Sequence, residues 1–114
     1  MTTSGPWRLS LEEGAARLRA RELTSVELTQ ACISRIEALE PALNAFITVT
    51  RERALADAAR ADRERAAGAD RGPLHGIPLS LKDLFDVRGV PTTAGGSFPA
   101  APAAADGAVA QRLT

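Results

Sequence analysis

The stretch GPLHGIPLSLKDLFDV, residues 72–87, separates two parts of the chain that differ in character. Its first half, residues 72–78, holds two glycines and two prolines without a helical period, and this composition predicts a loop. Residues 79–82 then alternate apolar and polar side chains, which predicts a short strand ending at Lys82. Helical patterns precede the stretch, and irregular, glycine-rich sequence follows it. We therefore expect an α/β protein in which N-terminal helices lead into the first strands of a sheet.

Two capping boxes upstream predict two helices, each with a glutamate three residues after the cap. The first opens at Ser10 and predicts a short helix over residues 10–21. The second opens at Thr24 and predicts a longer helix that Pro41 should stop. The expected buried stripe of this helix consists of Leu28, Cys32, Ile36 and Leu39. We interpret Cys32 as a small buried hydrophobe, because nothing near it in sequence would favour a thiolate.

One strand and one helix are expected between Pro41 and the stretch at 72–87. Residues 45–50, AFITVT, are rich in β-branched side chains and predict a short strand. Residues 51–67 return to a helical pattern, with opposite charges at i,i+4 spacing as on a solvated helix face. The two charge pairs are Arg53 with Asp57 and Arg60 with Glu64. Gly68 is the expected C-cap residue of this helix.

The end of the sequence predicts one more helix. Residues 100–105 are rich in Ala and Pro, which is typical of an exposed connection. Asp106 should cap a final helix that carries Val109 and Leu113 on its apolar face. The sequence stops inside this pattern, so we expect the N-terminal portion of a larger α/β protein. A complete small helical domain with a disordered C-terminal third is the alternative.

Charge and composition exclude several classes of function. Lysine plus arginine number 14 and aspartate plus glutamate number 14, so the formal net charge is zero and predicts no nucleic-acid or anionic-membrane partner. A single cysteine excludes an internal disulfide and a cysteine-based metal cluster. The first residues lack a signal-peptide pattern, and no run approaches the roughly 20 apolar residues of a membrane span. We therefore expect a cytoplasmic chain.

Lys82 is the only lysine among 14 basic residues, and it is the first candidate for chemistry. Arginine cannot lose its proton in a protein, whereas a lysine amine held among the neighbouring leucines would favour its neutral form and act as a base. Ser80, on the same face of the expected strand, could hydrogen-bond this amine. The alternative is a lysine at a strand end that reaches solvent or pairs with Asp83 or Asp86.

Two other features carry weaker signals. His75 has no second histidine and no carboxylate at ligand spacing, so we expect no metal site and interpret it as a loop histidine with one backbone hydrogen bond. Gly95-Gly96-Ser97 suggests a phosphate cradle, but neither a Gly-x-Gly-x-x-Gly motif nor a Walker lysine accompanies it. Neither feature predicts a cofactor.

The stretch at 72–87 and its continuation GVPTTAG at 89–95 resemble the first conserved block of the amidase signature family. That block runs Gly-Pro-Leu-x-Gly-Ile/Val-Pro-x-x-x-Lys-Asp and continues with Gly-x-x-Thr-Thr-x-Gly-Ser. Other segments are similar to the family's helices: residues 22–28, 43–46 and 106–113. The resemblance covers residues 9–114. It implies a mixed sheet flanked by helices, and it divides the chain into a tail (1–8), a helical segment with the short strand at 45–50 (9–68) and the start of the amidase core (69–114).

The resemblance also implies an enzyme that hydrolyses a small-molecule amide with a Ser–cis-Ser–Lys triad and without a cofactor. Lys82 matches the catalytic lysine, whose neutral amine accepts a proton through one serine so that a second serine attacks the carbonyl. Both serines belong to Gly/Ser-rich blocks that lie beyond residue 114 in the family. Ser97 is no substitute, because it belongs to the Thr-Thr segment, where Gly95-Gly96 adds one residue to the usual spacing. We therefore expect the triad to need the remainder of an amidase chain, and this chain alone to be inactive.

Three functions remain open on the basis of these motifs. The first is a plain amidase, and the second is the A subunit of a tRNA-dependent amidotransferase, which uses the same triad to release ammonia. Those subunits often have Cys at the position of Ala94 and less often the Asp-Leu-Phe-Asp string at 83–86, so these residues favour the plain amidase. The third is a truncated, non-catalytic piece that only binds or regulates.

Overall fold

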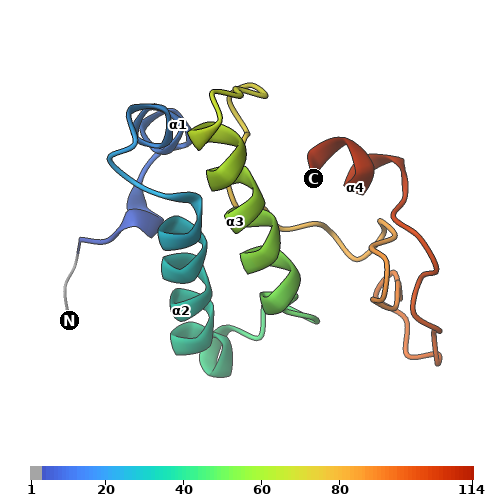
Figure 1. Ribbon diagram of the computed structural model, residues 1–114. Coiled ribbons are helices and arrows are strands. Elements are labelled where there is room, and N and C mark those ends of the chain that lie inside the picture. The colour runs from blue at the N-terminus through green and yellow to red at the C-terminus, as the bar shows by residue number, and fades with distance from the viewer. Residues whose placement is uncertain (1–3) are drawn as a thin grey trace. The chain divides into compact units, whose positions relative to one another are not determined.

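The computed structural model describes residues 4–114, which contain four α-helices and one 3-10 helix (Figure 1). The chain divides into two compact units, Met1–Pro78 and Leu79–Thr114. None of the described helices has the length and apolar character of a membrane-spanning helix.

The first unit is helical, and both predicted capping boxes are confirmed. Its elements are η1 (Pro6–Arg8), α1 (Leu11–Ala20), α2 (Ser25–Leu43) and α3 (Arg51–Ala66). The N–H groups of Glu13 and Glu27 each donate to the hydroxyl of the capping residue at 3.1 Å, and their carboxylates accept from the N–H of that same residue. These bonds satisfy backbone donors that the first helical turn leaves without partners.

The prediction that Pro41 stops the second helix is wrong. Pro41 lies inside α2, which continues to Leu43 and ends at Asn44 in the left-handed conformation, with φ of 49°. Proline fixes φ near the helical value, and its missing N–H removes one hydrogen bond of the last turns, so the helix continues for two residues beyond it. The N–H of Asn44 donates to the Glu40 carbonyl at 2.8 Å and completes the last turn.

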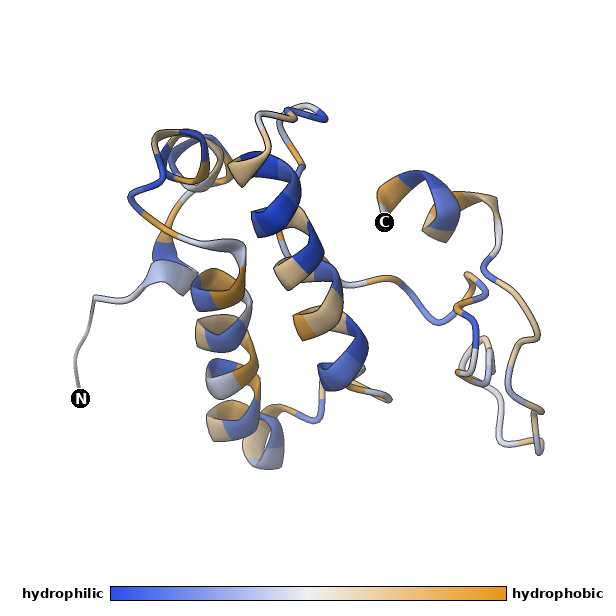
Figure 2. Ribbon diagram, viewed as in Figure 1, coloured by the Kyte–Doolittle hydropathy of each residue, from blue (hydrophilic) through white to orange (hydrophobic). Residues whose placement is uncertain are grey.

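The core of the first unit lies where α2 packs against α3. Of the predicted stripe on α2, only Leu28 is buried, and Cys32, Ile36 and Leu39 are half-buried. The buried face passes instead through Ile33 and the polar Ser25 and Thr29. The facing residues of α3, Ala58 and Ala61, are small and let the two helices approach closely. Charged residues occupy much of the rest of α3, where blue segments alternate with tan ones in Figure 2.

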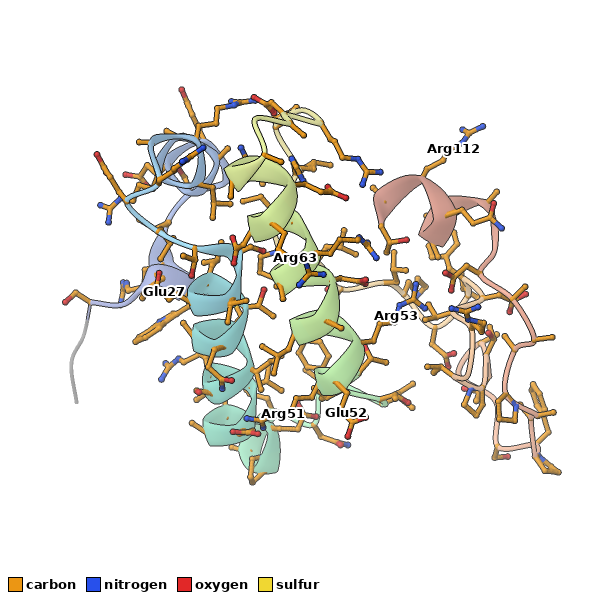
Figure 3. The ribbon with its side chains drawn as sticks, viewed as in Figure 1. Glu27, Arg51, Glu52, Arg53, Arg63 and Arg112 are labelled. Carbon is orange, nitrogen blue, oxygen red and sulfur yellow. The ribbon has the colours of Figure 1, made fainter. Side chains whose placement is uncertain are left out.

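Two polar contacts fix α3 to the two ends of α2. Asp62 accepts hydrogen bonds from the N–H groups of Ser25 and Val26, at 2.7 and 3.1 Å, and so caps α2 from a neighbouring helix. Arg51, at the first turn of α3, forms an ion pair with Glu37 of α2 (Figure 3). The predicted pairs along α3 are also present, at 3.6 Å for Arg53 with Asp57 and 3.9 Å for Arg60 with Glu64.

The two predicted strands are absent from the described residues. Residues 45–50 and 79–82 have no regular secondary structure, and Ile47 in the first of these segments is 71% exposed. β-Branched residues stabilise a strand only when a second strand supplies hydrogen bonds and a packing face. The only β-bridges among residues 4–114 join Arg88 with Ala103 and Pro91 with Pro102, so neither segment has such a partner.

The second unit, Leu79–Thr114, is mainly loop and ends in α4 (Ala108–Leu113). The prediction that Asp106 caps this helix is wrong, because the N-cap is Gly107 and no side chain caps the helix. The carboxylate of Asp106 instead accepts the Arg88 N–H at 2.8 Å. The buried residue of α4 is Ala110, whereas Val109 and Leu113 are each 37% exposed.

Candidate active site

Lys82 lies in the second unit at the start of a tight turn. Its carbonyl accepts the N–H groups of Leu84 at 2.7 Å and Phe85 at 3.2 Å, so the turn that follows fixes this carbonyl. Its side chain is exposed. Within residues 4–114 no ion pair joins Lys82 to a carboxylate, so the alternative of pairing with Asp83 or Asp86 is not found.

Asp83, the residue after Lys82, closes a loop by binding Thr93. The Thr93 N–H donates to Oδ1 of Asp83 at 2.8 Å, and the Thr93 hydroxyl donates to Oδ2. The Ala94 N–H donates to the Asp83 carbonyl at 2.9 Å. The hydrogen bonds from Thr93 hold the pKa of the Asp83 carboxyl below its ordinary value, because they favour the charged form. We call this set of contacts the Asp83–Thr93 clasp.

A second aspartate–threonine pair lies further along the same loop. The Thr92 hydroxyl donates to Oδ1 of Asp86 at 2.7 Å, and the Asp86 carbonyl accepts the Gly107 N–H at 2.9 Å. The loop reverses direction between Val87 and Val90, where the Val90 N–H donates to the Val87 carbonyl at 2.9 Å. Side-chain hydrogen bonds and one backbone bond therefore close residues 83–94, where an ordinary hairpin would have a backbone ladder.

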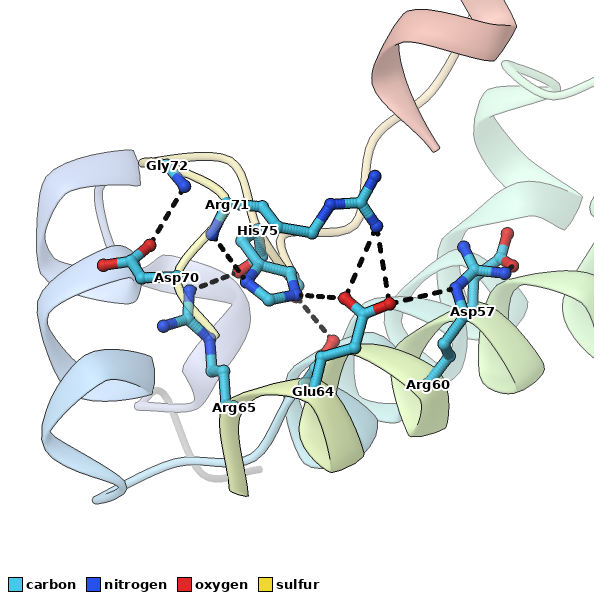
Figure 4. Close-up of polar contacts among 10 residues, drawn as sticks. Asp57, Arg60, Glu64, Arg65, Asp70, Arg71, Gly72 and His75 are labelled. Carbon is cyan, nitrogen blue, oxygen red and sulfur yellow. Dashed lines mark hydrogen bonds and ion pairs between the residues drawn. The ribbon is translucent and has the colours of Figure 1, made fainter. Parts of the chain in front are cut away.

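The loop before Lys82 belongs to the first unit and is anchored by His75. The ring of His75 is 4% exposed, and its Nδ1 accepts the Arg71 N–H at 3.2 Å while its Nε2 lies 2.8 Å from Oε2 of Glu64 on α3 (Figure 4). Because Nδ1 accepts a hydrogen bond, the neutral ring carries its proton on Nε2 and donates it to Glu64. The interpretation of His75 as a loop residue with one backbone bond missed this side-chain partner.

Arginines surround the His75–Glu64 pair. Arg65 donates to the His75 carbonyl at 2.7 Å, and Nη1 of Arg71 lies 3.4 Å from the Glu64 carboxylate (Figure 4). Desolvation raises the pKa of Glu64, but hydrogen bonds from His75 and Arg71 outweigh it and lower the pKa overall. This network ties α3 to the loop at residues 70–76.

Close backbone packing explains one glycine of this loop. Gly76 has φ of +83°, its carbonyl accepts the Ser25 hydroxyl at 2.6 Å, and a Cβ at this position would lie 3.2 Å from the Ser25 side chain. A larger residue would meet both backbone strain and crowding against α2. Gly76 therefore lets the loop lie directly against the first turn of α2.

The remaining candidate residues do not form a catalytic group within the described residues. Ser80 and Ser97 are exposed, and neither side chain has a hydrogen-bond partner among residues 4–114, so Ser80 does not bind the Lys82 amine. Cys32 is half-buried, and burial raises the pKa of its thiol, as expected for an unreactive cysteine. The sequence did not indicate that Thr93 binds Asp83 or that Glu64 binds His75, because these contacts join residues that are ten or more positions apart.

The amidase family model matches residues 27–114, more than half of the chain, and includes the Lys82 loop. The chain belongs to the amidase family. This amidase chain is 57% identical over 88 residues to the A subunit of a glutamyl-tRNA(Gln) amidotransferase from Methylococcus capsulatus, a match that covers 77% of this chain and 18% of that protein. The corresponding A subunit from Geobacter metallireducens is 54% identical over 85 residues, covering 75% and 17% of the two chains.

Solved structures show the same similarity. The peptide amidase of Stenotrophomonas maltophilia superposes with a TM-score of 0.86 at 40% identity, covering 95% of this chain and 23% of that one. A chain of an inhibitor-bound vestigial protein complex, which bears on the evolutionary origins of an s-triazine catabolic enzyme, superposes with a TM-score of 0.87 at 34% identity, covering 92% and 23%. The amidase chain therefore spans about a fifth of the length of these relatives.

Proposed function

We propose that this chain supplies the proton-transferring lysine of an enzyme that hydrolyses a carboxamide C–N bond. The observation that carries the proposal is the Lys82 turn, which lies inside the segment matched by the amidase family and holds the lysine backbone while leaving its amine exposed. An accessible amine can be covered by other parts of an amidase, and burial there would favour the neutral form that accepts a proton.

In the proposed reaction the neutral Lys82 amine accepts a proton through a bridging serine. A second serine then attacks the amide carbonyl, and backbone N–H groups stabilise the developing oxyanion. The protonated Lys82 returns the proton to the leaving nitrogen, which departs as ammonia or an amine, and water hydrolyses the acyl-serine to the acid. The family resemblance assigns both serines to Gly/Ser-rich segments that have no counterpart in residues 1–114.

The A subunit of a tRNA-dependent amidotransferase is the second candidate function. The A subunit from Methylococcus capsulatus is 57% identical over 77% of this chain, and the peptide amidase is 40% identical over a wider span, 95% of it. Ala94 and the string at 83–86 favour the plain amidase instead, so the two signals oppose each other. In both cases the chemistry at Lys82 is the same.

Two chimeras test the proposal in a complete enzyme. In one, this chain replaces the matching segment of the peptide amidase; in the other, it replaces the matching segment of the Methylococcus A subunit. We expect hydrolysis of a peptide amide by the first chimera or release of ammonia from glutamine by the second. In whichever chimera is active, the Lys82→Ala substitution should abolish the activity. Equal activity of the Lys82→Ala chimera would contradict the proposal.

A further inference from the structure

Every aspartate in residues 79–114 accepts a hydrogen bond from the same unit. Asp83 binds Thr93, Asp86 binds Thr92, and Asp106 accepts the Arg88 N–H at 2.8 Å. Two of these acids lie one and four positions from Lys82, and neither forms an ion pair with it.

This arrangement matters because a neighbouring carboxylate stabilises an ammonium group. An aspartate that pairs with a lysine favours the charged form, whereas a lysine that accepts a proton must first be neutral. A free Asp83 side chain would therefore oppose the function proposed for Lys82. Thr93 engages both oxygens of Asp83, one through its N–H and one through its hydroxyl.

We propose that Thr93 is a positioning residue, which binds the Asp83 carboxylate and so withholds it from the Lys82 amine. The inference rests on the function proposed for Lys82. The clasp also fixes the backbone on the C-terminal side of Lys82, because the Asp83 carbonyl is bound by the Ala94 N–H at 2.9 Å. The Thr92–Asp86 pair acts in the same way on the next acid along the loop.

The remaining charged side chains of the unit are accounted for. Besides Lys82, its cations are Arg88 and Arg112, and its acids are the three already described. The carboxylate of Asp83, whose pKa is lowered, stays charged at neutral pH, so loss of a hydrogen bond from Thr93 would leave negative charge on a freed oxygen. The Thr93→Val substitution frees Oδ2 with little change of shape, because valine keeps the N–H that binds Oδ1 and loses only the hydroxyl.

The test uses the fact that Lys82 is the only lysine. Lysine labelled with ¹³C at Cε gives a single side-chain NMR signal in the 114-residue chain, and its titration midpoint can be followed directly. We expect Thr93→Val to raise that midpoint by about half a pH unit, the size of an exposed ion pair. Thr93→Ser, which restores the hydroxyl, should return it to the parent value. Thr48→Val, the same change at an exposed threonine elsewhere, is the matched control and should not shift it.

A double variant separates charge release from simple loosening of the loop. In Asp83→Asn/Thr93→Val the freed side chain is neutral, so the rise seen in Thr93→Val should vanish. Slow exchange of the Ala94 amide with solvent reports that the loop remains closed, because none of these substitutions removes its acceptor, the residue 83 carbonyl. An unchanged midpoint in Thr93→Val, a rise that persists in the double variant, or fast Ala94 exchange in the parent would each overturn the proposal.

The peptide amidase chimera distinguishes failure of this inference from failure of the proposed function. In it, Thr93→Val should shift the rising limb of the kcat profile to higher pH by the same half unit, a loss of about 3-fold in kcat at a fixed pH on that limb with KM unchanged. A shifted lysine midpoint with an unshifted rate profile would reject Lys82 as the base while leaving the clasp intact. An unshifted midpoint would reject the clasp, whatever the rate.

Discussion

Nε2 of His75 lies 2.8 Å from Oε2 of Glu64, and this contact joins the loop at residues 72–78 to the last turn of α3. The loop has no regular secondary structure, so its position depends on side-chain contacts of this kind. The ring is buried, so a polar ring atom that lost its partner would stay without a hydrogen bond at a cost in free energy.

Substitution of His75 by alanine should loosen the loop locally. The Arg71 N–H loses its acceptor in a part-buried site, and loss of such a hydrogen bond costs about 0.5–1.5 kcal/mol. We expect the Arg71 amide to exchange with solvent roughly 2- to 13-fold faster in His75→Ala. Glu12→Gln, on the exposed face of α1, is the control and should not change this rate. Unchanged Arg71 protection in His75→Ala would show that the ring does not hold the loop.

Acid should open the Asp83–Thr93 clasp. The pKa of Asp83 is lowered in the folded chain, so its contribution to stability is complete above the ordinary value of 3.8 and is lost as the pH falls through the lowered folded value. We therefore expect the Thr93 amide to keep its protection well above 3.8 and to lose it progressively below that pH. Hydrogen exchange across this range measures the effect. In Asp83→Asn the profile should be flat, and an acid transition that survives in this variant would assign it to another group.

Lys82→Arg should be nearly as damaging as Lys82→Ala in an active chimera. Arginine keeps the charge and much of the length, but it cannot give up its proton to serve as a base. The expected loss of kcat is on the order of 10²-fold or more for both variants, with the rising limb of the pH profile abolished. An arginine variant with the parent kcat and pH profile would end the assignment of Lys82 as the base.

The 114-residue chain alone should not hydrolyse amides above the buffer background. Lys82 has no serine partner among the described residues, and Ser80 and Ser97 are both exposed without hydrogen-bond partners there. Release of a chromophore from a simple aryl amide measures the activity. Reproducible turnover that disappears in Lys82→Ala would require Ser80 or Ser97 to act as the nucleophile.

The sequence predicts features whose cause lies within a few residues. Both capping boxes place the two partners three residues apart, so Ser10 and Thr24 could be identified without knowing the fold. The strands at 45–50 and 79–82 are expected from side-chain type, but a strand also depends on a partner that local sequence does not reveal. The end of α2 is misplaced because a proline near the end of a helix removes one backbone hydrogen bond without ending the helix at once, and α2 continues through Pro41 to Leu43.

In the candidate site, too, the local features could be predicted from the sequence and the contacts between distant residues could not. Lys82 stands out in the sequence because it is the only lysine, and the family motif surrounds it. Its surroundings could not be predicted, since Asp83 and Thr93 are ten residues apart and His75 and Glu64 eleven, with no periodicity to connect them. A carboxylate followed after a glycine turn by two threonines is a signal that could have suggested the clasp.

The boundary between the two compact units falls between Pro78 and Leu79, inside the 72–87 stretch. The string that looks like one motif along the chain is therefore made of two parts with different anchors: His75 holds the first part to α3, and Asp83 holds the second to Thr93. Variants in the two halves should therefore fall into separate genetic classes. A defect in residues 72–78 should be suppressed only by changes at the His75–Glu64 contact, and a defect in residues 79–87 only by changes at the Asp83–Thr93 contact. One continuous motif in the sequence thus contains two separately anchored segments, which meet at the peptide bond from Pro78 to Leu79.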